Sequence, residues 1–176
     1  MPRCAHRENE LPFLEVSPYE ADRGELIGRD PREMDVELLR ELGVKSTPIK
    51  AIKDRCTDCV ETRVDRLRCE LTDCPLWVMR LGKNAHRIAK SNGAQGVAYM
   101  DAKGGVDPRT IAPEILEKLG HPLSPAKALR AHCVDCCRGS ESEVRKCTAI
   151  GCKLWPYRMG TSPFRPKSDA EAPLED

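Results

Sequence analysis

Eight cysteines in this sequence are spaced so that they can bind metal ions in two groups of four. The first group follows the pattern C-x2-C-x9-C-x4-C, and the second follows C-x2-C-x10-C-x4-C. A CxxC turn holds two thiolates at a separation that suits tetrahedral coordination, and a second cysteine pair completes the site. We therefore predict two metal sites, whose ligands are Cys56, Cys59, Cys69 and Cys74 in the first and Cys133, Cys136, Cys147 and Cys152 in the second.

Zinc is the metal expected for four cysteines without histidine. Such closed sites leave no position for water, so we predict two structural zinc ions. An iron–sulfur cluster is the alternative, because Cys74-Pro75 resembles ferredoxin sequences; Lys153 in the second copy and the missing C-x2-C-x2-C spacing argue against it. Disulfides are the third possibility. The chain has no secretory signal and no run of membrane-spanning length, so we expect a reducing cytoplasm, where metal binding is commoner.

The remaining candidate residues do not form a catalytic pattern. Cys137 can be a reactive thiol, a small filler or an alternative ligand, and Cys4 with His6 is too small a set for a site. The other histidines have no carboxylate partner at a recognisable spacing: His86, His121 and His132. The sequence has no phosphate-binding glycine loop and no serine nucleophile elbow. We therefore expect no catalysis, no small-molecule substrate and no membrane partner.

The elements that must position the cysteines occur twice. Asp30-Pro31-Arg32 predicts a helix start, and an apolar stripe from Met34 to Leu42 ends at Gly43. A second helix starts at Thr47-Pro48 and leads to the first cysteine pair. The same features recur 77 residues later, from Asp107 and from Ser124-Pro125. Further helices are expected between the cysteine pairs, from the spacing of Val60, Val64, Leu67 and Leu71 and from a capping box at Ser140.

These patterns predict a small, mainly α-helical protein with two tandem helix–helix–Cys4 units. Its aromatic content of 4% allows only small hydrophobic cores, which usually need a metal or a disulfide for stability. The predicted organisation is an extended N-terminal arm (1–27), a first unit (28–87), a glycine-rich linker with one short strand (88–104), a second unit (105–165) and a disordered acidic tail (166–176).

The charge distribution favours an anionic partner for the second unit. Residues 125–168 carry nine basic and three acidic side chains, whereas residues 1–44 carry six basic and eleven acidic ones. A nucleic acid such as DNA would be bound by basic side chains on its phosphates and by aromatic side chains on its bases. The candidates are Lys127, Arg130, Arg138, Arg145, Lys146, Arg158 and Trp155.

Two alternatives to this interpretation remain open. Trp77 and Trp155 occupy equivalent positions, and each can instead cover the small core beside its metal site. A protein–protein adaptor or inhibitor, built on the same zinc scaffold, is the alternative to nucleic-acid binding.

The second unit also resembles a cysteine-rich family of small proteins from phages, prophages and proteobacterial genomes. The resemblance rests on Lys127-Ala128-Leu129-Arg130, Cys133-x-x-Cys136-Cys137, Glu143-Val144-Arg145-x-Cys147 and Leu154-Trp155-Pro156-Tyr157-Arg158. The family signature is KAIR-x-x-C-x-DCC-x-G…EVR-x-C-x4-CPLWPYR-x-G. This chain departs from it at Lys153, at Val60 and at Val78-Met79. The resemblance implies a metal-binding module and a bacterial or phage setting, and it implies no activity.

Overall fold

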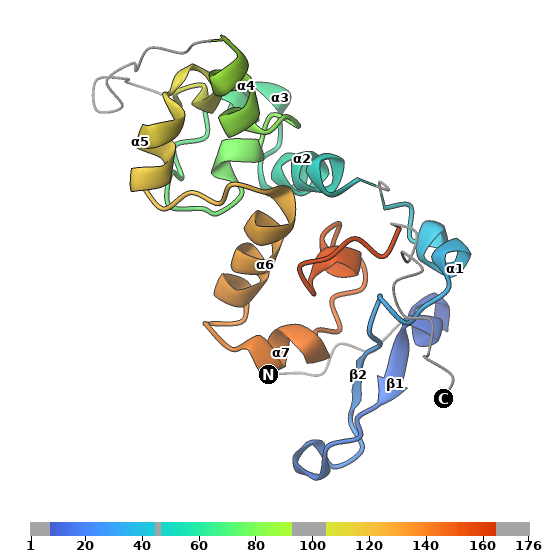
Figure 1. Ribbon diagram of the computed structural model, residues 1–176. Helices are drawn as coiled ribbons and strands as arrows, with labels where there is room; N and C mark the ends of the chain where they lie inside the picture. Colours follow the sequence, from blue (N-terminus) through green and yellow to red (C-terminus); the bar gives the residue numbers. More distant parts are fainter. Residues whose placement is uncertain (1–7, 45–46, 93–104, 165–176) are drawn as a thin grey trace, which may run out of the picture.

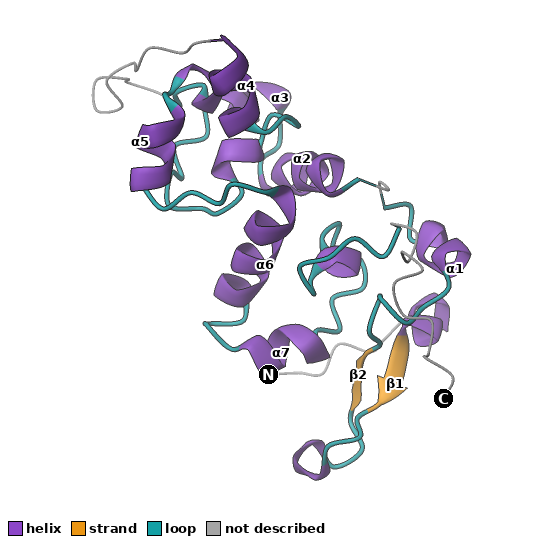
Figure 2. Ribbon diagram, in the orientation of Figure 1, coloured by secondary structure: helices purple, strands orange, loops and turns teal. Residues whose placement is uncertain are grey.

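The computed structural model describes residues 8–44, 47–92 and 105–164, and this part of the chain is mainly helical, as predicted (Figures 1 and 2). The predicted acidic tail and most of the predicted linker, with its strand, lie outside the described residues. The α-helices are α1 (Val36–Glu41), α2 (Pro48–Cys59), α3 (Arg63–Leu67), α4 (Ala85–Asn92), α5 (Pro113–Lys118), α6 (Pro125–Cys136) and α7 (Glu141–Lys146). The strands are β1 (Leu14–Val16) and β2 (Leu26–Gly28), and the short 3-10 helices are η1 (Glu8–Phe13), η2 (Glu20–Asp22), η3 (Trp77–Met79), η5 (Pro108–Thr110) and η6 (Trp155–Tyr157).

The N-terminal segment is more ordered than an extended arm. Strands β1 and β2 form an antiparallel hairpin in which Glu15 lies opposite Ile27. Phe13, Leu14 and Ile27 are buried, so the hairpin contributes apolar side chains to the core. The predicted extended arm (1–27) was wrong over its described part (8–27), because two three-residue strands are too short to give a periodic pattern.

The predicted starts of the longer helices are confirmed. Of the two earlier starts, Asp107 caps the short 3-10 helix η5, which ends before α5 begins at Pro113, and the start at Asp30 is not found. Pro48 and Pro125 begin α2 and α6, and the Ser124 hydroxyl accepts a hydrogen bond from the N–H of Lys127. Asp30, in contrast, binds the backbone N–H and side chain of Arg32 within a turn, and α1 begins later with Asp35 as its N-cap. The predicted linker was also wrong at its start, because α4 continues to Asn92.

Helices α1 and α5 each pack against the cysteine-bearing segment of the other half of the chain. Leu39 of α1 lies in a cluster with Ile150 and Trp155. Leu116 of α5 lies in a cluster with Trp77 and the residues around it. The first helix of each predicted unit (28–87 and 105–165) therefore covers the cysteine segment of the other unit. Figure 1 shows this arrangement: α5 lies beside α4, and α1 and the β1–β2 hairpin lie in the same half of the molecule as α7.

The fold thus has two lobes. The first lobe combines residues 47–92 and 105–123, whereas the second combines the N-terminal segment (8–44) with residues 124–164. Helices α2 and α6 contact each other between the lobes, where the small side chains of Ala51 and Ala128 are completely buried. No helix in the described ranges is long and apolar enough to cross a membrane.

Candidate metal centres

The four cysteines of the first predicted set lie around one cavity. Cys56 and Cys59 occupy the end of α2, and Cys69 and Cys74 lie in the loop that follows α3. All four line a cavity of about 60 Å³, together with Arg66, Trp77, Arg80 and, from α6, His132. The structure therefore brings together residues that are up to 18 positions apart in the sequence, as the spacing predicted.

The second set is built on the same elements. Cys133 and Cys136 lie at the end of α6, and Cys147 and Cys152 follow α7. Burial and the neighbouring thiols of Cys152, Cys147, Cys136 and Cys137 raise the pKa of Cys133 to about 12. Cys136, Cys137 and Cys147 also line a wide cavity of about 700 Å³ with residues of the hairpin. The second set is therefore more open on one side than the first.

The chemistry of both sets suits a soft cation. Burial and the thiols of Cys74, Cys69 and Cys59 raise the pKa of Cys56 to about 12, so that a buried thiolate needs a positive partner. Burial also raises the pKa of Cys74 and Cys147, while the backbone N–H groups of Leu76 and Ala149 donate to these sulfurs and lower it. These N–H donors would stabilise thiolates once an ion has displaced their protons.

The nine described cysteines are free thiols. Across the described ranges, no three Cys, His, Asp or Glu side chains are grouped closely enough to hold an ion as they stand. Metal binding would thus have to draw the sulfurs of each set together.

A tryptophan fixes the backbone of the third cysteine in each set. Trp77 Nε1 donates to the Cys69 carbonyl oxygen over 2.9 Å, and Trp155 Nε1 donates to the Cys147 carbonyl oxygen over 2.8 Å. Both indole rings are 1% exposed. Of the two interpretations left open by the sequence, the structure favours a tryptophan that covers the core beside each cysteine set. Trp155 has no free face for a base, so it leaves the set of candidate nucleic-acid contacts.

An arginine lies against each of these tryptophans and is equally buried. The guanidinium carbon of Arg80 is 4.5 Å from the centre of the Trp77 ring, and that of Arg158 is 4.1 Å from the Trp155 ring. Both arginines are 1% exposed and donate to main-chain carbonyl groups. Arg158 is therefore a structural residue, and its predicted role in phosphate contact is wrong because it cannot reach a phosphate.

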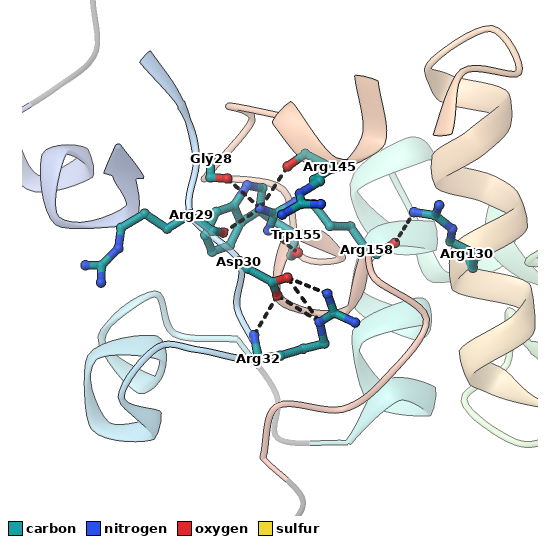
Figure 3. Close-up of polar contacts among 8 residues, drawn as sticks. All are labelled: Gly28, Arg29, Asp30, Arg32, Arg130, Arg145, Trp155 and Arg158. Atoms are coloured by element: carbon teal, nitrogen blue, oxygen red, sulfur yellow. Dashed lines mark hydrogen bonds and ion pairs between the residues drawn. The ribbon is translucent and has the colours of Figure 1, made fainter. Parts of the chain in front are cut away.

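Each buried arginine joins its cysteine segment to the part of the chain that covers it. Arg158 donates to the carbonyl oxygens of Gly28 and Arg29, which are 3.0 and 2.5 Å away at the start of the first repeat (Figure 3). Arg80 donates over 2.6 Å to the carbonyl oxygen of Val106, at the corresponding position of the second repeat. These contacts hold the first part of each predicted unit on the cysteine segment of the other unit.

The other basic candidates differ in exposure. Lys127, Arg138 and Arg145 are exposed. Arg130 is half-buried, and it donates to Glu141 and to the Arg158 carbonyl oxygen. Lys146 is paired with Asp22 over 2.6 Å. Three of the seven predicted contact residues are therefore available to an anion without breaking an ion pair among the described residues.

His132 was not recognised from the sequence as a neighbour of a metal site. His132 lies on α6, which contacts α2, and its Nδ1 atom lies 4.0 Å from the sulfur of Cys74 in the loop after α3. The corresponding position in the first repeat is Arg55, so no repeated histidine marks it. Only the three-dimensional crossing of the two helices could have revealed it. Comparisons with protein-family models, with curated proteins and with solved structures find no match for this chain.

Proposed function

We propose that this chain is a zinc-binding protein with two structural Cys4 centres, and that it presents a basic surface of its second half to a nucleic acid. The observation that carries the metal assignment is the cavity lined by Cys56, Cys59, Cys69 and Cys74. Bound zinc would supply the positive charge that buried thiolates need, and it would fix two loops to two helix ends.

Metal analysis of anaerobically purified protein tests this assignment. We expect about two zinc ions per chain and no visible absorbance. Adjacent cysteines give a matched pair of variants: Cys136→Ser should lose one zinc ion, whereas Cys137→Ser should keep both. A broad visible absorbance band with stoichiometric iron would contradict zinc. Equal metal loss in both variants would contradict the proposed ligand set.

Nucleic-acid binding is supported by the three exposed basic residues Lys127, Arg138 and Arg145. Among the described residues, none of the three takes part in an ion pair, so their charges are free to attract phosphate. Each phosphate contact on a DNA duplex changes the slope of log K against log salt concentration by about 0.9. Replacing all three with alanine should therefore weaken binding and lower the slope by roughly three times that amount.

The control for this test is another exposed helical arginine. Arg40 and Arg145 are both the fifth residue of a six-residue helix, but Arg40 lies in the acidic N-terminal part. Arg145→Ala should weaken binding to duplex DNA, single-stranded DNA or RNA, and Arg40→Ala should not. Absence of measurable affinity for all three at low salt would rule out nucleic-acid binding while leaving the zinc assignment intact.

A protein adaptor is the second candidate, and one surface favours it. Val64, Leu67 and Leu71 beside the first cysteine set are 50%, 41% and 63% exposed. The corresponding positions of the second set are Ser142, Arg145 and Ala149, so the apolar character is specific to the first lobe. Binding through this surface would persist at high salt and would be lost in a Leu67→Ser variant, the reverse of the pattern expected for phosphate contacts.

A further inference from the structure

His132 lies between the two candidate metal centres. It lines the cavity of the first set, and its Nδ1 atom is 4.0 Å from Cys74 Sγ. The next residue along α6 is Cys133, the first ligand of the second set. Two consecutive residues of one helix therefore face two different cysteine sets.

This arrangement is specific to one centre. The repeat places Arg55 at the position of His132, and both side chains line the first cavity. No histidine is among the residues that line the wide cavity beside the second set. Among the described residues that line these two cavities, only the first centre has an imidazole neighbour.

The imidazole is suited to donate a hydrogen bond to a metal-bound thiolate. A sulfur that binds an ion keeps lone pairs, and an N–H donor aimed at one of them disperses its negative charge. An imidazole ring carries an N–H that can lie on Nδ1, so His132 can serve as this donor. Partners of this kind outside the ligand shell typically change metal affinity by about 10–100-fold.

We propose that His132 is a positioning residue of the first metal centre, which donates its Nδ1–H to the sulfur of Cys74 and so links the occupancy of this centre to that of the second. This inference rests on the proposed zinc sites. The link arises because His132 and Cys133 are held by the same turn of α6. An ion bound by Cys133 fixes the rotation of this turn and therefore the direction of the imidazole. By reciprocity, occupancy of the first centre must favour occupancy of the second.

The test uses the full chain loaded with ¹¹³Cd in place of zinc. Cadmium NMR should give two resonances, one for each centre. His132→Ala should shift the resonance of the first centre and leave that of the second in place. It should also weaken metal binding at the first centre by about 10–100-fold. His132→Asn, whose amide N–H lies near the position of Nδ1, should restore most of the affinity. Glu114→Ala, an exposed position of α5, should change neither resonance.

Three outcomes would overturn the inference. If His132→Ala left both resonances and both affinities unchanged, the imidazole would have no role at the centre. A nitrogen–cadmium scalar coupling to the His132 ring would make His132 a direct ligand instead. Equal affinity of the first centre in Cys147→Ser protein and in the native chain would disprove the link. If the native chain bound no metal, the proposed zinc sites themselves would fail, which is a separate and recognisable result.

Discussion

Replacing Arg158 with lysine should destabilise the second lobe although the charge is kept. The guanidinium of Arg158 donates to four main-chain carbonyl groups, at Trp155, Gly28, Arg29 and Arg145, over 2.5 to 3.4 Å. Two of these carbonyls belong to the N-terminal segment, about 130 positions earlier in the chain. Because the side chain is 1% exposed, water cannot replace a lost donor.

The expected loss follows from the number of acceptors. A lysine ammonium is a compact charge without the planar fork of arginine, and it can serve at most about two of the four carbonyls. Each lost hydrogen bond to a charged group costs about 1.5–3 kcal/mol. The free energy of unfolding should therefore fall by roughly 3–6 kcal/mol, a large part of the ~5–15 kcal/mol that is typical of a domain.

Urea unfolding followed by circular dichroism measures this change, and hydrogen exchange locates it. Amides of residues 8–44 should lose protection in Arg158→Lys, because the segment that covers Trp155 is no longer held. Arg145→Lys, the same substitution at an exposed position, should stay within about 0.5 kcal/mol of the native protein. If Arg158→Lys also stayed within that range, or if protection were lost mainly in the first lobe, the account of the crossed packing would be wrong.

Four further predictions address the lobes and the cysteine sites. A Cβ on Gly28 would lie 2.1 Å from the Cys147 carbonyl oxygen, so Gly28→Ala should lower the urea midpoint, whereas Gly151→Ala, with open space around it, should not. Potentiometric titration should detect about four protons released per zinc ion at neutral pH, because each thiol must lose its proton to bind. Burial raises the pKa of Asp107, but the hydrogen bonds and charge of Arg109 outweigh this effect, so the pKa lies below its ordinary value of about 3.9. The ionised Asp107 carboxylate therefore stabilises the fold above the ordinary pKa, and this stabilisation is lost as the pH falls through the lowered value. Asp107→Asn should make the free energy of unfolding less dependent on pH in that range. The fragment 47–123 should bind one zinc ion, because it contains all four cysteines of the first set.

The cysteine spacing and the repeat could be read from the sequence because both are local. A CxxC pair at the end of a helix, and a proline at its start, are set by residues within one or two turns. The helices at Pro48, Pro125 and Glu141 accordingly agree with the prediction. The structural role of Asp30 was predicted wrongly although it too depends on neighbouring residues. A carboxylate followed two residues later by arginine can close a turn as well as cap a helix.

The roles of the buried tryptophans and arginines could not be read in the same way. A repeated basic and aromatic cluster has the composition of a phosphate-binding surface whether it faces solvent or the core. What decides is the presence of main-chain carbonyls that lie far away in sequence, such as those of Gly28 and Val106. Hydrogen bonds to backbone carbonyls leave no trace in the identity of the residues that accept them.

The internal repeat also explains why the packing partners could not be predicted. Two copies of a unit offer two solutions with the same local contacts: each first helix can cover its own cysteine segment or that of the other copy. The choice depends on what lies between the elements, and here helix α4 extends the first cysteine segment toward α5, with which it packs. Among the described residues, no α-helix follows the second cysteine segment, and its tryptophan is covered by Phe13 and Leu39 from the N-terminal segment. One lobe therefore combines neighbouring parts of the chain and the other requires both ends, which makes the second lobe the one whose stability depends on the long-range contacts of Arg158.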